Sequence, residues 1–139
     1  MSQENVEIVR RSWEVFLDGA SRDDLGAVFD EELFAPTASV FPPVEVVFSR
    51  RYVGRAGFVE WQRSWAESFD ELRISPEQIV DAGPDRVLVV VHQTATGRGS
   101  GAAVEERFGM VYVLENAQVT SLHVYRDPAD ALKAVGLEE

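Results

Sequence analysis

The chain has 139 residues, of which 45% are hydrophobic and 27% are charged. These values are typical of one globular domain, so we expect a single domain over residues 1–139 and neither a disordered nor a coiled-coil chain. The 24 acidic and 13 basic side chains give a net charge of −11. This charge repels phosphates and anionic lipids, so neither nucleic acid nor a membrane is an expected partner.

The inventory of metal-binding residue types is small. The chain has no cysteine, which excludes disulfides, thiolate nucleophiles and cysteine-ligated metals, and its two histidines lie far apart in the sequence. We therefore predict no metal site and no cofactor. The first residues show no signal-peptide pattern, and the apolar run at 87–91 is too short to span a membrane. Together with the absence of cysteine, this predicts a cytoplasmic protein.

Helical patterns begin the chain. Apolar side chains recur at helical spacing between Val6 and Leu17, and Gly19 is placed to end this first helix with a left-handed cap. A second helix start, with an acidic residue in its first turn, is predicted at 21–24. Two short strands, at 38–41 and 44–48, are predicted next.

A glycine-punctuated turn at 52–57 leads into a long helix. Aromatic side chains follow at spacings of three, four and four residues: Phe58, Trp61, Trp65 and Phe69. This is the strongest amphipathic pattern in the chain, so one face of the predicted helix is expected to be buried.

The second half of the chain shows strand patterns. Strands are predicted at 72–81, 86–96, 103–114 and 119–126, followed by a short helix capped by Asp127. Pro76 indicates an edge or a bulge in the first of these strands. This order predicts an α+β cone, in which three helices pack on one face of a strongly curved antiparallel sheet, with a short C-terminal helix. A cone of this kind encloses a natural pocket for a small apolar molecule.

Five segments occur in a distinctive order: ENVEIVRR at 4–11, DL at 24–25, YVGRAG at 52–57, IVDAG at 79–83 and VYRDPADAL at 124–132. In these segments, which span nearly the whole chain, the sequence resembles the nuclear transport factor 2-like superfamily and, within it, the SnoaL-like polyketide cyclase family. The resemblance implies a cone-shaped fold and a homodimer that pairs through the outer face of the sheet. It also implies a cofactor-independent enzyme of the cyclase, isomerase or dehydratase type, with acid/base groups inside the cone.

The sequence departs from the enzymatic members of this superfamily at two places. The stretch 38–43 holds no carboxylate where such members frequently have one, and Gly109 or Met110 stands where the ketosteroid-isomerase pattern has a protonated acid. These departures favour a second hypothesis, a ligand-binding or dimerisation domain without catalysis.

Histidine and tyrosine are the candidate acid/base groups. His92 and His123 both lie in predicted strands, and a half-buried imidazole can accept a proton near neutral pH. If either faces the cone, it can act as the base, with Tyr125 or Tyr112 as the hydrogen-bond donor to a developing enolate. The alternative is that the histidines lie on the outer face of the sheet and the tyrosines are core residues.

Aromatic side chains are the candidate ligand-binding groups. Large rigid rings can line a cavity for a hydrophobic, aromatic or polycyclic molecule, and Arg107 can hold a ligand carboxylate with its planar guanidinium group. The candidate ligand-binding residues are Trp13, Phe16, Trp61, Trp65, Phe69 and Arg107. The alternatives are core packing for the rings and a solvated sheet face for Arg107.

Overall fold

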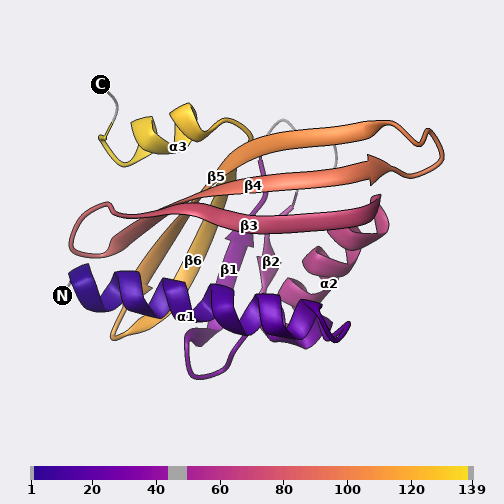
Figure 1. The fold of residues 1–139 in the computed structure, drawn as a ribbon. Helices are drawn as coiled ribbons and strands as arrows, with labels where there is room; N and C mark the ends of the chain where they lie inside the picture. Colours follow the sequence, from indigo (N-terminus) through magenta and orange to yellow (C-terminus); the bar gives the residue numbers. More distant parts are fainter. Residues whose placement is uncertain (1, 44–49, 138–139) are drawn as a thin grey trace.

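Six strands form one curled sheet in the order β2-β1-β6-β5-β4-β3. The computed structural model describes residues 2–43 and 50–137. In chain order the elements are α1 (Ser2–Ala20), the 3-10 helix η1 (Leu25–Val28), β1 (Phe34–Phe41), β2 (Tyr52–Val53), α2 (Gly54–Glu67), β3 (Phe69–Asp81), β4 (Arg86–Gly97), β5 (Ala103–Glu115), β6 (Gln118–Tyr125) and α3 (Pro128–Ala134). Helices α1 and α2 cover one face of the sheet, here called the inner face, while α3 packs on the opposite, outer face (Figure 1).

The predicted fold class is confirmed: the chain is an α+β cone with a short C-terminal helix. The sheet is mixed rather than wholly antiparallel, because β1 runs parallel to its neighbour β6 and pairs Val40 with Leu122. The other neighbouring pairs are antiparallel. A parallel pair needs a long connection, and here α2 and the strands β3 to β5 lie between its two members.

Pro76 lies where its missing N–H is tolerated. Strand β3 is at one edge of the sheet, and its pairing with β4 shifts register between Pro76 and Gln78. Both features that Pro76 indicates, an edge and an irregularity, are therefore confirmed. Irregularities of this kind increase the local twist of a strand, which helps the sheet to curl over the helices.

Three helix predictions need correction. The predicted second helix is only the four-residue η1, and α2 ends at Glu67, so Phe69 is the first residue of β3. Gly19 does not form a left-handed cap, since it lies within α1. A Cβ at Gly19 would lie 2.1 Å from the Cβ of Ala27, so glycine is needed there for the close approach of the η1 segment. The predicted strand at 44–48 lies outside the described residues.

Gly109 plays a similar part on the outer face. A Cβ at this position would lie 2.5 Å from the Cβ of Ala131, whose residue is fully buried in α3. Asp127 caps α3 by accepting a hydrogen bond from the Ala129 N–H at 2.9 Å, and Pro128 occupies the first turn, as predicted.

In the described part of the chain, no helix has the length and apolar character required to cross a membrane.

Candidate functional site

Strand alternation separates the inner and outer faces. In β4, Val87, Val89 and Val91 contribute to the core under α1 and α2, whereas Leu88 packs with Ala131 of α3 on the other side. The same alternation places Gln93 on the inner face and His92 on the outer face. The face therefore decides which of the candidate residues can reach the interior of the cone.

A small cavity of about 40 Å³ lies between the helices and the inner face. Its lining is mainly aromatic and includes Trp13, Phe16, Phe58, Trp61, Trp65 and Phe108. Three neutral polar residues, Ser12, Gln62 and Tyr112, also line it. Among the described lining residues none is charged, so the interior of the cone is apolar with a few neutral polar groups.

A larger groove of about 530 Å³ adjoins this cavity, and Trp61, Trp65 and Phe108 line both spaces. We call the two spaces the inner cavity and the outer groove. Tyr52 and Phe69 add further rings to the groove, and its polar lining consists of Ser64, Ser68, Gln93, Glu106 and Arg126. A volume of this size lies within the range of small-molecule sites, roughly 300–1,000 Å³.

The aromatic wall is a row of ring contacts, two edge-on and one tilted, that runs from α2 to β5. The ring centroids of Phe58 and Trp61 are 6.3 Å apart, those of Trp61 and Trp65 are 5.5 Å apart, and those of Trp65 and Phe108 are 5.1 Å apart. The helical spacing of three and four residues puts the first three rings on one face of α2. The row gives both spaces a common, rigid apolar side.

Gln93 fixes the orientation of one ring in this row. Its side-chain Oε1 accepts a hydrogen bond from Nε1 of Trp65 at 3.0 Å, and the residue is only 2% exposed. A buried amide beside an indole N–H satisfies both groups and holds the ring in one orientation. Gln93 was not among the residues expected at the site, although its alternation with Val89 and Val91 is a sequence signal for the inner face.

Tyr112 lines the inner cavity from β5, the neighbour of the strand β4 that carries Gln93. Burial raises the pKa of its hydroxyl far above the usual value of 10, and the polar groups of the neighbouring Trp13 and Ser12 side chains oppose this shift only in part. The hydroxyl therefore stays protonated and can donate a hydrogen bond over the whole physiological pH range.

Glu106 and Arg126 are the two charged side chains among the described lining residues of the outer groove. Both residues are exposed, so they lie at its solvent side. Neither residue was expected at the site from the sequence. The signal for Glu106 is its alternation with Phe108 and Met110, since all three occupy every second position of β5 and share the inner face.

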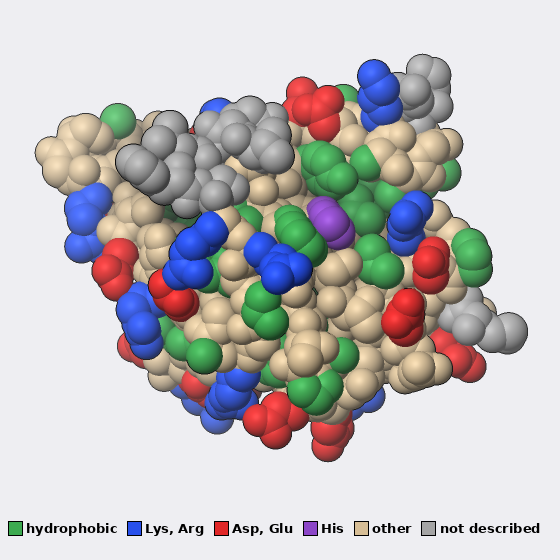
Figure 2. All heavy atoms as spheres, turned by 180° about the vertical axis from the view of Figure 1, so that it is seen from behind, with side chains coloured by type: hydrophobic (Ala, Val, Ile, Leu, Met, Phe, Trp, Pro, Cys, Tyr) green, Lys and Arg blue, Asp and Glu red, His purple; other side chains and the backbone are tan. Residues whose placement is uncertain are grey.

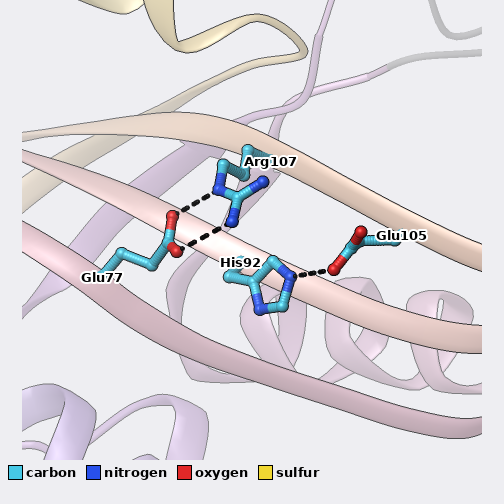
Figure 3. Close-up of polar contacts among 4 residues, drawn as sticks. All are labelled: Glu77, His92, Glu105 and Arg107. Carbon is cyan, nitrogen blue, oxygen red and sulfur yellow. Dashed lines mark hydrogen bonds and ion pairs between the residues drawn. The ribbon is translucent and has the colours of Figure 1, made fainter.

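His92 and Arg107 lie together on the outer face, away from both spaces. Arg107 makes a two-pronged ion pair with Glu77, with N–O distances of 2.7 and 3.2 Å, and His92 Nε2 lies 2.9 Å from Glu105 Oε2. Figure 3 shows these four side chains reaching across β3, β4 and β5. The partner of Arg107 in this structure is thus a carboxylate of the chain itself.

His123 and Tyr125 also lie on the outer face. His123 stacks on Phe41 with ring centroids 4.5 Å apart, and its Nε2 lies 3.3 Å from the Ser121 hydroxyl. Tyr125 packs in the apolar cluster under α3. Burial, and then the charge of Arg86, lower the pKa of His123 below 6.5. In the view of Figure 2, a histidine reaches the surface among hydrophobic side chains, and acidic and basic groups are interspersed around it.

The structure thus divides the candidate residues into two groups. Trp13, Phe16, Trp61, Trp65, Phe69 and Tyr112 line the inner cavity or the outer groove, while His92, His123, Tyr125 and Arg107 line neither. The condition for a His–Tyr pair inside the cone is therefore not met by either histidine. Within residues 2–43 and 50–137, no cluster of three or more histidines and carboxylates is arranged to hold a metal ion.

The curled sheet, the helices over its inner face and the aromatic spaces between them define an α+β cone of the NTF2-like class. The sequence model of the SnoaL-like domain family matches residues 10–122 of this chain. The chain belongs to the SnoaL-like domain family. No curated protein has a matching sequence.

Solved structures share this fold over nearly the whole chain. An NTF2-like protein of unknown function from Burkholderia pseudomallei is 21% identical, with a TM-score of 0.71 and coverage of 95% of this chain and 97% of that chain. A putative SnoaL-like polyketide cyclase from Jannaschia sp. is 18% identical, with a TM-score of 0.70 and coverage of 99% and 94%. SalBIII, an epoxide hydrolase/cyclase-like enzyme with a role in pyran ring formation in the polyether salinomycin, is 23% identical, with a TM-score of 0.67 and coverage of 90% and 93%. Identities this low establish a common fold and nothing further.

Proposed function

We propose that this chain binds a small hydrophobic molecule whose aromatic rings lie in the outer groove. The observation that carries the proposal is the continuous aromatic wall of Trp61, Trp65 and Phe108, which lines both spaces. Transfer of apolar surface from water to this wall contributes roughly 25 cal/mol per Å² of buried area. The ring contacts add orientation, because aromatic pairs prefer offset and edge-on arrangements.

Binding is testable with an uncharged aromatic probe, 2-ethylnaphthalene, in equilibrium dialysis. We expect Trp65→Leu to weaken binding about tenfold, because it removes a ring from the common wall. Phe41→Leu is the matched control, since Phe41 is an aromatic residue on the outer face. Absence of binding to the unmodified chain, or equal affinities for the chain and both variants, contradicts the proposal.

A second candidate function is cofactor-independent acid/base catalysis on the bound molecule. The favouring observation is that Glu106 and Arg126 line the outer groove together with the aromatic wall. In this function, the Glu106 carboxylate accepts a proton from an acidic carbon of the ligand, and the positive charge of Arg126 stabilises the enolate that forms. The same proton returned to another position completes an isomerisation. Catalytic roles for His92, His123, Tyr125 and Tyr112 stay predictions, and of these only Tyr112 lines a cavity.

Hydrogen–deuterium exchange separates the catalytic function from binding without catalysis. With 2-tetralone in D2O, a catalytic chain accelerates exchange of the ligand's acidic C–H protons, as followed by NMR. We expect Glu106→Gln to reduce this acceleration about 100-fold or more. Glu105→Gln is the matched control, because Glu105 lies on the outer face beside His92. Tight binding of the ketone without faster exchange contradicts catalysis and supports the non-catalytic alternative.

We further propose a homodimer in the cytoplasm. The dimer is supported by the family resemblance, and the location by the cysteine-free sequence. Sedimentation velocity tests the assembly: a single species at the mass of one chain across the micromolar range contradicts the dimer. The location is tested by fractionation of the native host cells.

A further inference from the structure

The inner cavity has a polar end formed by side chains from α1, α2 and β5. Trp13 Nε1 is fully buried and has no hydrogen-bond partner, the one such side-chain atom within residues 2–43 and 50–137. Gln62 is 7% exposed, and no side-chain hydrogen bond joins it to the described residues. An unpaired buried N–H is costly, so its position beside a cavity indicates an acceptor that comes from outside the chain.

The groups at this end are mainly hydrogen-bond donors. An indole N–H can only donate, and the protonated Tyr112 hydroxyl beside it can donate as well. The Ser12 hydroxyl is already committed to the carbonyl oxygen of Val9 at 2.7 Å. The complementary ligand group is therefore an acceptor.

The cavity selects an uncharged acceptor. Its described lining has no cationic side chain, so a carboxylate would lose its hydration without gaining a counter-ion. A purely hydrocarbon group would leave the Trp13 N–H unpaired. A carbonyl oxygen satisfies the donors and carries no net charge.

The size of the inner cavity also limits the ligand group that it can hold. Its volume of about 40 Å³ is well below the roughly 150 Å³ of an apolar cavity that holds benzene. A small substituent fits there, while the outer groove of about 530 Å³ has room for rings. We propose that the inner cavity is a subsite for an uncharged carbonyl oxygen, carried by an aromatic ligand whose rings lie in the outer groove. This inference rests on the proposed binding function and is independent of catalysis.

A matched pair of ligands tests the subsite. The ketone 2-acetylnaphthalene and the hydrocarbon 2-ethylnaphthalene have similar shapes and differ by one carbonyl oxygen. The measured quantity is the ratio of their two dissociation constants in equilibrium dialysis. This ratio cancels changes that affect the apolar part of binding equally.

Two variants remove donors and keep aromatic rings. We expect Trp13→Phe and Tyr112→Phe each to shift the ratio about five- to tenfold in favour of the hydrocarbon, the effect of one lost hydrogen bond. The control Thr94→Val removes a hydroxyl from the outer face of β4 and leaves the ratio unchanged. Circular dichroism checks that each variant is folded, and Gln62→Met replaces any variant that is not.

Infrared spectroscopy adds a direct readout. A hydrogen-bonded carbonyl group absorbs at a lower wavenumber than the same group in an apolar solvent, and we expect Trp13→Phe to reverse part of this shift. If both ligands bind but the donor variants change neither the ratio nor the carbonyl band, the subsite is wrong while the binding function stands. If neither ligand binds, the proposed function fails and the subsite fails with it.

Discussion

The two faces of the sheet carry different chemistry although the same strands supply both. In β4, Gln93 faces inward and accepts a hydrogen bond from Trp65, whereas His92, one residue before it, faces outward and pairs with Glu105. On the inner face, Gln93 and the Trp65 ring hold each other in place. On the outer face, Arg107 pairs with Glu77 near water. Position relative to the two faces, more than residue type, therefore decides which side chains can act on a bound molecule.

Charge marks the boundary between these regions. The described lining of the inner cavity is uncharged, and Glu106 and Arg126 stand at the solvent side of the outer groove. A carboxylate at the edge of an apolar space keeps its hydration until a ligand covers it. The groove thus offers an apolar binding surface and a charged pair in one place, while the histidines are separated from it by the sheet.

The largest difference between the faces is expected for buried aromatic residues. Phe58 is fully buried and contacts the rings of Phe29, Phe34 and Trp61. We expect Phe58→Ala to lower the free energy of unfolding by about 3–5 kcal/mol, because it leaves a cavity in the core. Urea denaturation measures this change.

Phe41→Ala is the corresponding change on the outer face. Phe41 is only half-buried and stacks on His123, so we expect a clearly smaller loss of stability than for Phe58→Ala. Equal losses for the two variants would show that the core is not concentrated between the helices and the inner face.

A second pair of variants compares neighbouring residues of β4. Gln93→Leu leaves the Trp65 N–H without its acceptor, and we expect a loss of about 1–3 kcal/mol in the free energy of unfolding. We also expect weaker binding of 2-ethylnaphthalene, since the ring loses its fixed orientation. His92→Leu removes a partly exposed contact with Glu105, and we expect it to leave the binding of 2-ethylnaphthalene unchanged. If only His92→Leu lost binding, His92 would contribute to the ligand site.

These neighbouring residues also show what could be predicted from the sequence. The helical spacing of Phe58, Trp61 and Trp65 was enough to predict a buried aromatic face, because that period is built into the helix. The order of the helices and strands predicted the cone, and the family resemblance implied the same fold. Alternation along β4 puts His92 on the same face as Leu88, but it does not tell which face α1 and α2 cover, since both faces of β4 are rich in valine and leucine. That choice depends on contacts between distant elements.

Phe69 and Glu106 illustrate two further limits. Phe69 continues the helical spacing of α2, yet the chain leaves the helix two residues earlier, and the ring reaches the outer groove from β3 instead. Glu106 lies in the run Glu105 to Arg107, which has the pattern of a solvated surface. The groove that Glu106 lines exists only once α2 has packed beside β5.

A smaller effect, dependent on pH, is expected at His123. Because burial lowers its pKa below 6.5, the unfolded chain binds a proton more readily than the folded chain. The stability contribution is complete above pH 6.5 and is lost as the pH falls from 6.5 toward the lowered pKa. We expect His123→Phe, which preserves the stack on Phe41, to lose less stability than the unmodified chain between about pH 7 and 5.

Urea denaturation at several pH values measures this difference, and NMR titration of the imidazole protons gives the pKa itself. A midpoint for His123 at or above 6.5 contradicts the expectation. Ligand binding provides the comparison with the inner face: since His123 lies on the other side of the sheet, its protonation should leave the affinity for 2-ethylnaphthalene unchanged.

The smallest effect is expected for Arg107, the candidate ligand-binding residue that lies on the outer face. Its side chain is exposed and already pairs with Glu77, and exposed ion pairs are screened by salt and contribute little. We therefore expect Arg107→Gln to bind 2-ethylnaphthalene and 2-naphthoate as the unmodified chain does. The matched variant Arg126→Gln removes a cation from the outer groove, so it should weaken 2-naphthoate binding and leave 2-ethylnaphthalene binding unchanged. If the effects of the two variants were exchanged, anionic ligands would bind on the outer face, and the assignment of the ligand site to the inner face would be wrong.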